Sequence, residues 1–285
     1  MTTLAMTLVL VAAFAHASWN FLLKKACGGT AFVWLFASFS AIIYAPLAVV
    51  VAWQQSHIGL VQILFMAGSA IINLVYYLLL EKGYQVGDLS LVYPLARGTG
   101  PVLATAAAIL IFSEQPTTVA FIGAMLVSLG IICLARNPRI LHDPMAKKGI
   151  IYALLTGVSV AAYTLWDKYS VSTLLIPPLL LNWAINFGRS MVLVPYAWRH
   201  WQQVMQVWRE HRQEVLGVAI LNPLSYILVL SAMVFSPVSY IAPFREISVL
   251  IGIILGVRLL SENEFKHRMI AAAIILLGEL LLAFG

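Results

Sequence analysis

Residues 90–99, SLVYPLARGT, resemble residues 239–248, SYIAPFREIS, at a separation of 149 positions. Residues 109–114, ILIFSE, likewise resemble residues 257–262, VRLLSE, 148 positions further on. Two more matches keep nearly the same separation: Gly130 with Gly278, and residues 19–20 with residues 166–167. Because one almost constant separation relates all of these matches, the chain consists of two similar halves.

The composition predicts a membrane protein. Of the 285 residues, 62% are hydrophobic and only 10% are charged, whereas a soluble domain usually carries about 25% charged residues. The mean hydropathy of +0.94 also excludes an intrinsically disordered chain, since disorder requires low hydrophobicity and a high net charge. The Lys and Arg residues that give the net charge of +6 lie mostly between apolar runs. They are therefore interpreted as orientation signals and not as a nucleic-acid surface.

Ten apolar runs are long enough to cross a bilayer as helices, and they are too long for the alternating strands of a barrel. They comprise residues 3–23, 31–53, 59–80, 90–112, 117–135, 149–167, 175–198, 215–235, 238–260 and 266–284. We interpret the first run as a retained helix and not as a cleaved signal peptide, because no Lys or Arg precedes it. The expected units are a first repeat at 1–137, a cytoplasmic linker at 138–148 and a second repeat at 149–285.

Five spans in each half place the second half in the membrane in the opposite sense. The charges agree, because Lys and Arg gather in the loops after spans one, three, five, seven and nine, whereas the termini and the other loops hold only Lys168. The positive-inside rule makes the basic side cytoplasmic and both termini periplasmic or extracellular. We therefore expect an all-α polytopic membrane protein with ten transmembrane helices in two inverted five-helix repeats, a pattern typical of secondary transporters.

The longest polar stretch is residues 199–214, RHWQQVMQVWREHRQE. Its tryptophans and valines recur at helical spacing among Arg and Gln residues. This pattern predicts a short helix that lies along the membrane interface with its tryptophans as anchors.

Four ionisable residues inside the predicted spans are candidates for substrate contact: Arg97, Arg189, Arg245 and Glu246. Each such group costs about 2.5–3.5 kcal/mol on insertion, so it indicates a functional role unless it is paired. The alternative for Arg97 is a structural ion pair, and the repeat places Glu246 opposite it. Three arginines against one glutamate favour an anionic or zwitterionic substrate.

The other candidates for substrate contact are Trp19, Asn20, Tyr93, Tyr163 and Asn186. Asn186 shares one face of its helix with Arg189, so the pair either lines a pathway or joins neighbouring helices. For Trp19 the alternative is a place in the interfacial aromatic belt. Glu246 and His16 are the candidates for proton coupling, because both side chains can change protonation state.

The chain resembles the EamA type of the drug/metabolite transporter superfamily. The resemblance rests on the ten short spans, on the Ser-Glu pair before the last span of each half and on the proline in each fourth span. Residues 16–20, HASWN, and residues 93–98, YPLARG, are similar to a subgroup associated with phosphonate-utilisation genes. The family resemblance implies movement of small polar metabolites by alternating access without ATP hydrolysis, and no Walker A pattern occurs.

We therefore expect a secondary active transporter of a small polar or anionic metabolite, such as an amino acid, an organic acid or a phosphonate. Two alternatives stay open: a proton-coupled exporter of cationic amines or drugs, and a subunit of a lipid-carrier flippase. We expect no enzymatic activity, no cofactor, no metal and no nucleic-acid partner. The protein is expected in the inner (plasma) membrane, in contact with the lipid bilayer, as a monomer, with a dimer as the alternative.

Overall fold

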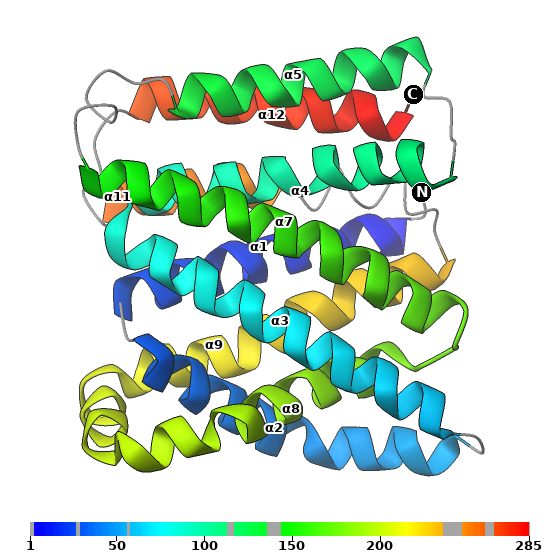
Figure 1. Ribbon diagram of the computed structural model, residues 1–285, viewed down its shortest axis with the longest axis vertical. Coiled ribbons are helices and arrows are strands. Elements are labelled where there is room, and N and C mark those ends of the chain that lie inside the picture. The colour runs from blue at the N-terminus through cyan, green and yellow to red at the C-terminus, as the bar shows by residue number, and fades with distance from the viewer. Residues whose placement is uncertain are drawn as a thin grey trace.

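The computed structural model describes residues 3–26, 29–55, 58–112, 117–135, 144–235, 247–259 and 265–284, and these residues are almost entirely helical (Figure 1). The first half contains α1 (Thr3–Ala26), α2 (Gly29–Gln54), α3 (Leu60–Val86), α4 (Leu89–Phe112) and α5 (Thr118–Ala135). The second half contains α7 (Pro144–Ser172), α8 (Pro178–Arg199), α9 (Trp201–Phe235), α11 (Ile247–Leu259) and α12 (Phe265–Phe284). The helical class is confirmed for this part of the chain, and α7 begins inside the expected linker.

Long apolar helices identify a multi-pass membrane protein. Within the described residues, four stretches are long and apolar enough to cross a bilayer: Thr7–Ala26, Gly29–Gln54, Leu60–Val86 and Met145–Val171. Large apolar side chains such as Ile42, Leu64 and Ile71 are exposed on the outside of the bundle. A soluble protein rarely exposes so much apolar surface, so this surface is explained by contact with lipid.

The helices of the second half run opposite to their counterparts in the first half. Figure 1 shows α1 running from right to left and α7 from left to right, and the same reversal is visible for α2 and α8, for α3 and α9, and for α5 and α12. The beginning of α1 and the end of α12 lie on the same side of the bundle. The described helices therefore have the inverted arrangement that the odd number of predicted spans per half requires.

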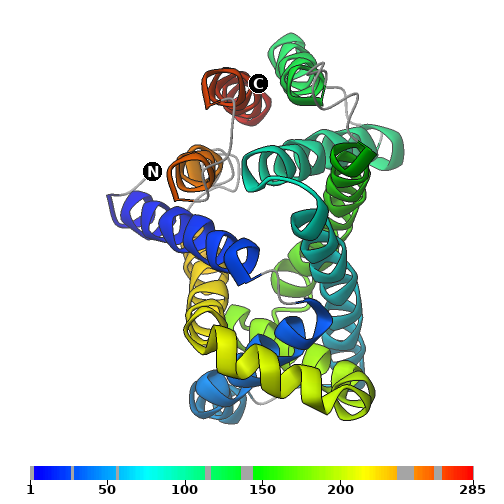
Figure 2. The same cartoon turned by 90° about the vertical axis from the view of Figure 1, so that its left-hand side faces the viewer.

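The packing between the halves has the same approximate two-fold symmetry. Helix α1 packs on α9, and equivalently α7 packs on α3; α2 also contacts α9 as α8 contacts α3. Figure 2, viewed along the helices, shows α5 and α12 side by side at one end of the molecule. A Cβ atom added at Gly130 would lie 2.5 Å from Ile275 Cγ1, and one added at Gly278 would lie 2.6 Å from Val127 N. Each glycine thus allows the close approach of the partner helix at the equivalent position.

Helix α9 contains a bend that separates a surface segment from the rest. His211 has φ −128° and ψ 28°, outside the helical range, and divides residues 201–210 from the longer part that follows. Figure 2 shows the first segment, in yellow-green, lying crosswise to the other helices over the end of the bundle. Trp198 and Trp201 are exposed at this end. The segment expected at the interface is thus a helix with the crosswise orientation that an interfacial position requires.

The substitution Gly278→Ala is expected to destabilise the protein by about 1–3 kcal/mol, because the new methyl group overpacks the contact between α5 and α12. Thermal unfolding of the purified protein in detergent measures the change. Gly59→Ala is the control, since its added Cβ meets only the end of the flexible Gln62 side chain, at 3.1 Å. Equal losses of stability in the two variants would contradict the tight packing inferred at Gly278.

Candidate functional site

A narrow polar cavity lies between the two halves of the bundle. Side chains of α1, α3, α7, α8 and α9 line it: His16, Trp19, Asn73, Tyr76, Tyr77, Tyr163, Asn182, Ile185, Arg189, Asn222, Ser225 and Tyr226. About 40 Å³ of the cavity is open to water, and one water needs about 10–15 Å³ of such space. In this conformation the cavity therefore has room for a few waters, and a metabolite requires the lining helices to move apart.

The lining includes matched pairs from the two halves. Residues 70–80, AIINLVYYLLL, on α3 resemble residues 219–229, AILNPLSYILV, on α9 at a separation of 149 positions. This match pairs Asn73 with Asn222 and Tyr77 with Tyr226, and all four side chains line the cavity. The amide of Asn222 donates a hydrogen bond to the hydroxyl oxygen of Tyr77. Our prediction of site residues missed this match between α3 and α9, although the sequence alone shows it.

Arg189 is the buried cation of this cavity. Its side chain on α8 is 1% exposed, and its Nη1 donates a hydrogen bond to Asn186 Oδ1 at 3.2 Å. The guanidinium carbon lies 3.9 Å from the ring centroid of Tyr77 and 5.4 Å from that of Phe36. Within the described ranges no carboxylate pairs with Arg189, and its Nε has no acceptor.

A buried guanidinium with a spare donor is energetically unfavourable unless an anion satisfies it. Two aromatic faces and one amide oxygen stabilise the charge in part. They do not replace an opposite charge, and an uncompensated buried ion carries a large desolvation penalty. The arrangement at Arg189 is therefore suited to a carboxylate or phosphonate that enters the cavity.

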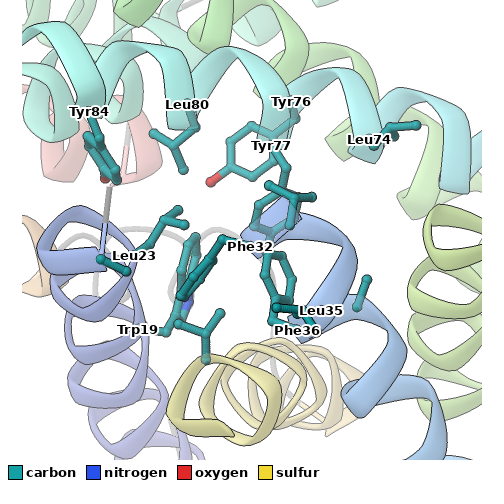
Figure 3. Close-up of a cluster of buried hydrophobic side chains, with 14 of the residues drawn as sticks. Trp19, Leu23, Phe32, Leu35, Phe36, Leu74, Tyr76, Tyr77, Leu80 and Tyr84 are labelled. Carbon is teal, nitrogen blue, oxygen red and sulfur yellow. The ribbon is translucent and has the colours of Figure 1, made fainter. Parts of the chain in front are cut away.

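Aromatic rings connect the cavity to the rest of the core. Figure 3 shows Trp19, Phe36 and Tyr77 gathered where α1, α2 and α3 meet. The ring centroids of Trp19 and Tyr77 are 5.6 Å apart, and those of Phe36 and Tyr77 are 5.3 Å apart. Such packing holds Tyr77 beneath the guanidinium of Arg189.

The predicted site residues occupy different positions. His16, Trp19, Tyr163 and Arg189 line the cavity together, and Asn186 supports Arg189 from one turn away. The indole of Trp19 donates to His16 Nδ1 at 3.3 Å. Their participation in substrate binding stays a prediction.

Asn20, Tyr93 and Arg97 are buried but are not part of the cavity lining. Asn20 accepts a hydrogen bond from the Tyr84 hydroxyl at 2.6 Å, which joins α1 to α3. The Tyr93 hydroxyl donates to Ser248 Oγ at 2.8 Å, which joins α4 to α11.

Arg97 lies on α4 within electrostatic reach of Tyr76, a lining residue. The other two ionisable candidates, Arg245 and Glu246, lie outside the described residues. The expected pairing of Arg97 with Glu246 therefore stays a prediction.

Asp167 is a buried carboxylate that the prediction of site residues did not include. It lies on α7, is 2% exposed, and accepts hydrogen bonds from the hydroxyl of Ser69, the amide of Asn73 and the hydroxyl of Tyr226. The Asn73 amide is 3.4 Å and the Tyr226 hydroxyl 2.7 Å from Oδ2. Because Asn73 and Tyr226 line the cavity, Asp167 lies one hydrogen bond behind the cavity wall.

Two lysines at the end of α1 connect it to neighbouring helices. Lys24 Nζ donates to the carbonyl oxygens of Tyr84 at 2.6 Å and Gly87 at 2.7 Å, at the end of α3, where a cation is favoured by the helix dipole. Lys25 Nζ lies 2.9 Å from Glu214 Oε1, which connects α1 to the bend region of α9.

Glu214 precedes the apolar part of α9 and has a shifted pKa. Burial raises the pKa of Glu214. A hydrogen bond from Lys25, a hydrogen bond from a backbone amide and the charges of Lys25 and His211 lower it, and together they hold the pKa below the ordinary value of 4.5. The net shift favours the charged form of Glu214 in the folded protein.

A protein-family model of the EamA-like transporter family matches residues 3–136 and again residues 147–284. The two matches cover nearly the whole chain and correspond to its two halves, so the chain belongs to the EamA-like transporter family. This assignment, together with the apolar helices, makes it a multi-pass membrane transporter of the drug/metabolite superfamily type. A comparison with curated proteins finds no match.

Glu214→Gln is expected to lower stability at neutral pH by less than about 1 kcal/mol, because the side chain of Lys25 is 54% exposed and the ion pair is screened by water. The folded-state pKa of Glu214 is lowered, so its contribution is complete above pH 4.5 and is lost as the pH falls through the folded-state value. The melting temperatures of the two proteins should therefore converge on acidification. A difference that grows on acidification would contradict the assigned ion pair.

Proposed function

We propose that this chain is a secondary active transporter that moves a small organic anion or zwitterion by alternating access. The observation that carries the proposal is the buried guanidinium of Arg189, which faces the cavity without a carboxylate partner among the described residues. A substrate bearing a carboxylate or phosphonate supplies the missing opposite charge. A planar guanidinium binds either group through two parallel hydrogen bonds.

The remaining lining favours a small polar substrate. Asn73, Asn182 and Asn222 offer amide donors and acceptors, and the tyrosine hydroxyls add further polar contacts. These amide and hydroxyl groups suit a small polar solute better than an acyl chain. The polar lining therefore supports a metabolite transporter over a subunit of a lipid-carrier flippase.

The inverted halves support the alternating-access part of the proposal. Helices of both halves line one cavity, and rocking one half against the other exposes such a site to the two sides of the membrane in turn. We propose that all ten helices span the inner (plasma) membrane, with the basic loops in the cytoplasm and both termini outside. The substrate-binding residues proposed from the sequence also include Arg97 on the fourth span, and Arg245 and Glu246 on the ninth.

A thermal-shift panel on the purified protein tests the proposed substrate class. Succinate, methylphosphonate and L-alanine represent anions and zwitterions, and ethanolamine represents a cationic amine. We expect an anion or zwitterion to stabilise the protein, by about 2.7 kcal/mol at 100 times its dissociation constant. Arg189→Gln should abolish this stabilisation, because it removes the positive charge from the cavity.

Arg199→Gln is the matched control, because Arg199 lies at the exposed end of the same helix. It should keep the ligand-induced shift in melting temperature. Stabilisation by ethanolamine alone, retained in Arg189→Gln, would instead favour an exporter of cationic amines and would overturn the proposal.

A further inference from the structure

We propose that Asp167 is a reversible proton-binding site that links its protonation state to the wall of the transport cavity. The role of this site as the coupling residue rests on the proposed transport function. Three observations carry the proposal: the fixed position of Asp167, its neutral hydrogen-bond donors, and the presence of two of these donors in the cavity lining.

The residue before Asp167 fixes its position against α3. Trp166 Nε1 donates to the Phe65 carbonyl oxygen at 2.9 Å, and the two rings stack with centroids 4.5 Å apart. A Cβ atom added at Gly68 would lie 2.5 Å from the Trp166 ring, so the absence of a side chain there allows the contact. This packing brings the Asp167 carboxylate to Ser69, one residue beyond Gly68.

The hydrogen-bond partners of the carboxylate among the described residues are all neutral. Its donors are two hydroxyl groups and one amide, and no cation pairs with it within the described ranges. Burial favours the protonated form, whereas the hydrogen bonds favour the charged form. Because no cation of the described residues holds Asp167 in its ionised state by an ion pair, both protonation states are accessible to it.

Other titratable and charged groups surround this part of the bundle. They are Tyr76 and Tyr77 on α3, Arg97 on α4, Tyr163 on α7, Tyr226 on α9, and His16 and Arg189 on the cavity wall. Of these only Tyr226 makes a hydrogen bond to Asp167. Arg189 shares the cavity but forms no ion pair with Asp167.

Protonation of Asp167 changes which hydrogen-bond donors the cavity wall presents to a solute. When a proton from water adds to Oδ2, that oxygen becomes a hydroxyl group, and the charge-assisted bonds from Tyr226 and Asn73 are lost. The hydroxyl hydrogen of Tyr226 and the amide hydrogen of Asn73 that pointed to Oδ2 can then turn to a solute in the cavity, while the Asn73 amide keeps its bond to the Ser69 carbonyl oxygen. Loss of the same proton restores the carboxylate, and the hydrogen bonds from Tyr226 and Asn73 to Oδ2 form again. The proton and the solute are thereby linked through the same two side chains.

The first half of the chain carries a non-titrating counterpart. Residues 19–20, Trp-Asn, align with residues 166–167, Trp-Asp. Asn20 accepts a hydrogen bond from the Tyr84 hydroxyl, although Tyr84 is not the repeat counterpart of Tyr226. A neutral asparagine is thus accommodated in the interior at the equivalent position of α1. The comparison indicates that Asp167→Asn preserves the fold and removes only the titratable group.

Infrared difference spectroscopy during a pH titration of the purified protein in lipid tests the proposal without a substrate. Protonated carboxyl groups have a distinct C=O stretching band, and tyrosine C–O vibrations report a change in hydrogen bonding. We expect a carboxyl band that appears together with a tyrosine signal on acidification. Asp167→Asn should abolish both, whereas Glu279→Gln, a change at another buried carboxylate, should leave both in place.

Tyr226→Phe keeps the carboxyl group but removes one donor. It should eliminate the tyrosine signal and shift the frequency of the Asp167 band, which keeps the proposal testable if Asp167→Asn does not fold. Unchanged carboxyl and tyrosine signals in Asp167→Asn, or an unshifted carboxyl band in Tyr226→Phe, would overturn it. The proposed transport function fails separately, if no anion or zwitterion stabilises the protein through Arg189.

Discussion

The structure depends on how the bundle accommodates the positive charge of Arg189, which is buried at the cavity between its two halves. Arg189 lies inside a helical bundle, beside an amide oxygen and above an aromatic ring, with no carboxylate pairing with it in the described part of the chain. In an interior of low dielectric this is costly, so the charge needs either a polar cavity or a bound anion. The same requirement accounts for the tyrosines and asparagines that surround it on neighbouring helices.

The two halves contribute equivalent side chains to the cavity, whereas its charged groups occupy positions at which the two halves differ. Asn73 and Asn222 come from equivalent positions of the two halves and line the same space. In contrast, Asp167 corresponds to an asparagine in the first half, and the guanidinium that lines the cavity, that of Arg189, comes from the second half. The symmetric framework permits the cavity to face either side of the membrane, while the second half supplies both charged groups identified at the cavity.

Much of the fold was predictable because apolar runs determine where helices cross a membrane. Most predicted spans agree with the described helices to within a few residues, and the two halves were evident from short matches such as Gly130 with Gly278. The candidate site was less predictable, because the register between helices decides which side chains meet. Asp167 is the last residue of a predicted span and precedes Lys168, so its place in the sequence does not distinguish a buried side chain from an exposed one. In the structure the packing of Trp166 on α3 places the Asp167 side chain in the interior.

The central claim is that Arg189 receives the negatively charged group of the transported molecule. An electron cryomicroscopy structure in saturating methylphosphonate or L-alanine tests it most directly. The account predicts a phosphonate or carboxylate oxygen within hydrogen-bonding distance of Arg189 Nε, the donor that has no acceptor among the described residues. A glutamate side chain paired with Arg189 in that structure, with the ligand bound elsewhere, would contradict it.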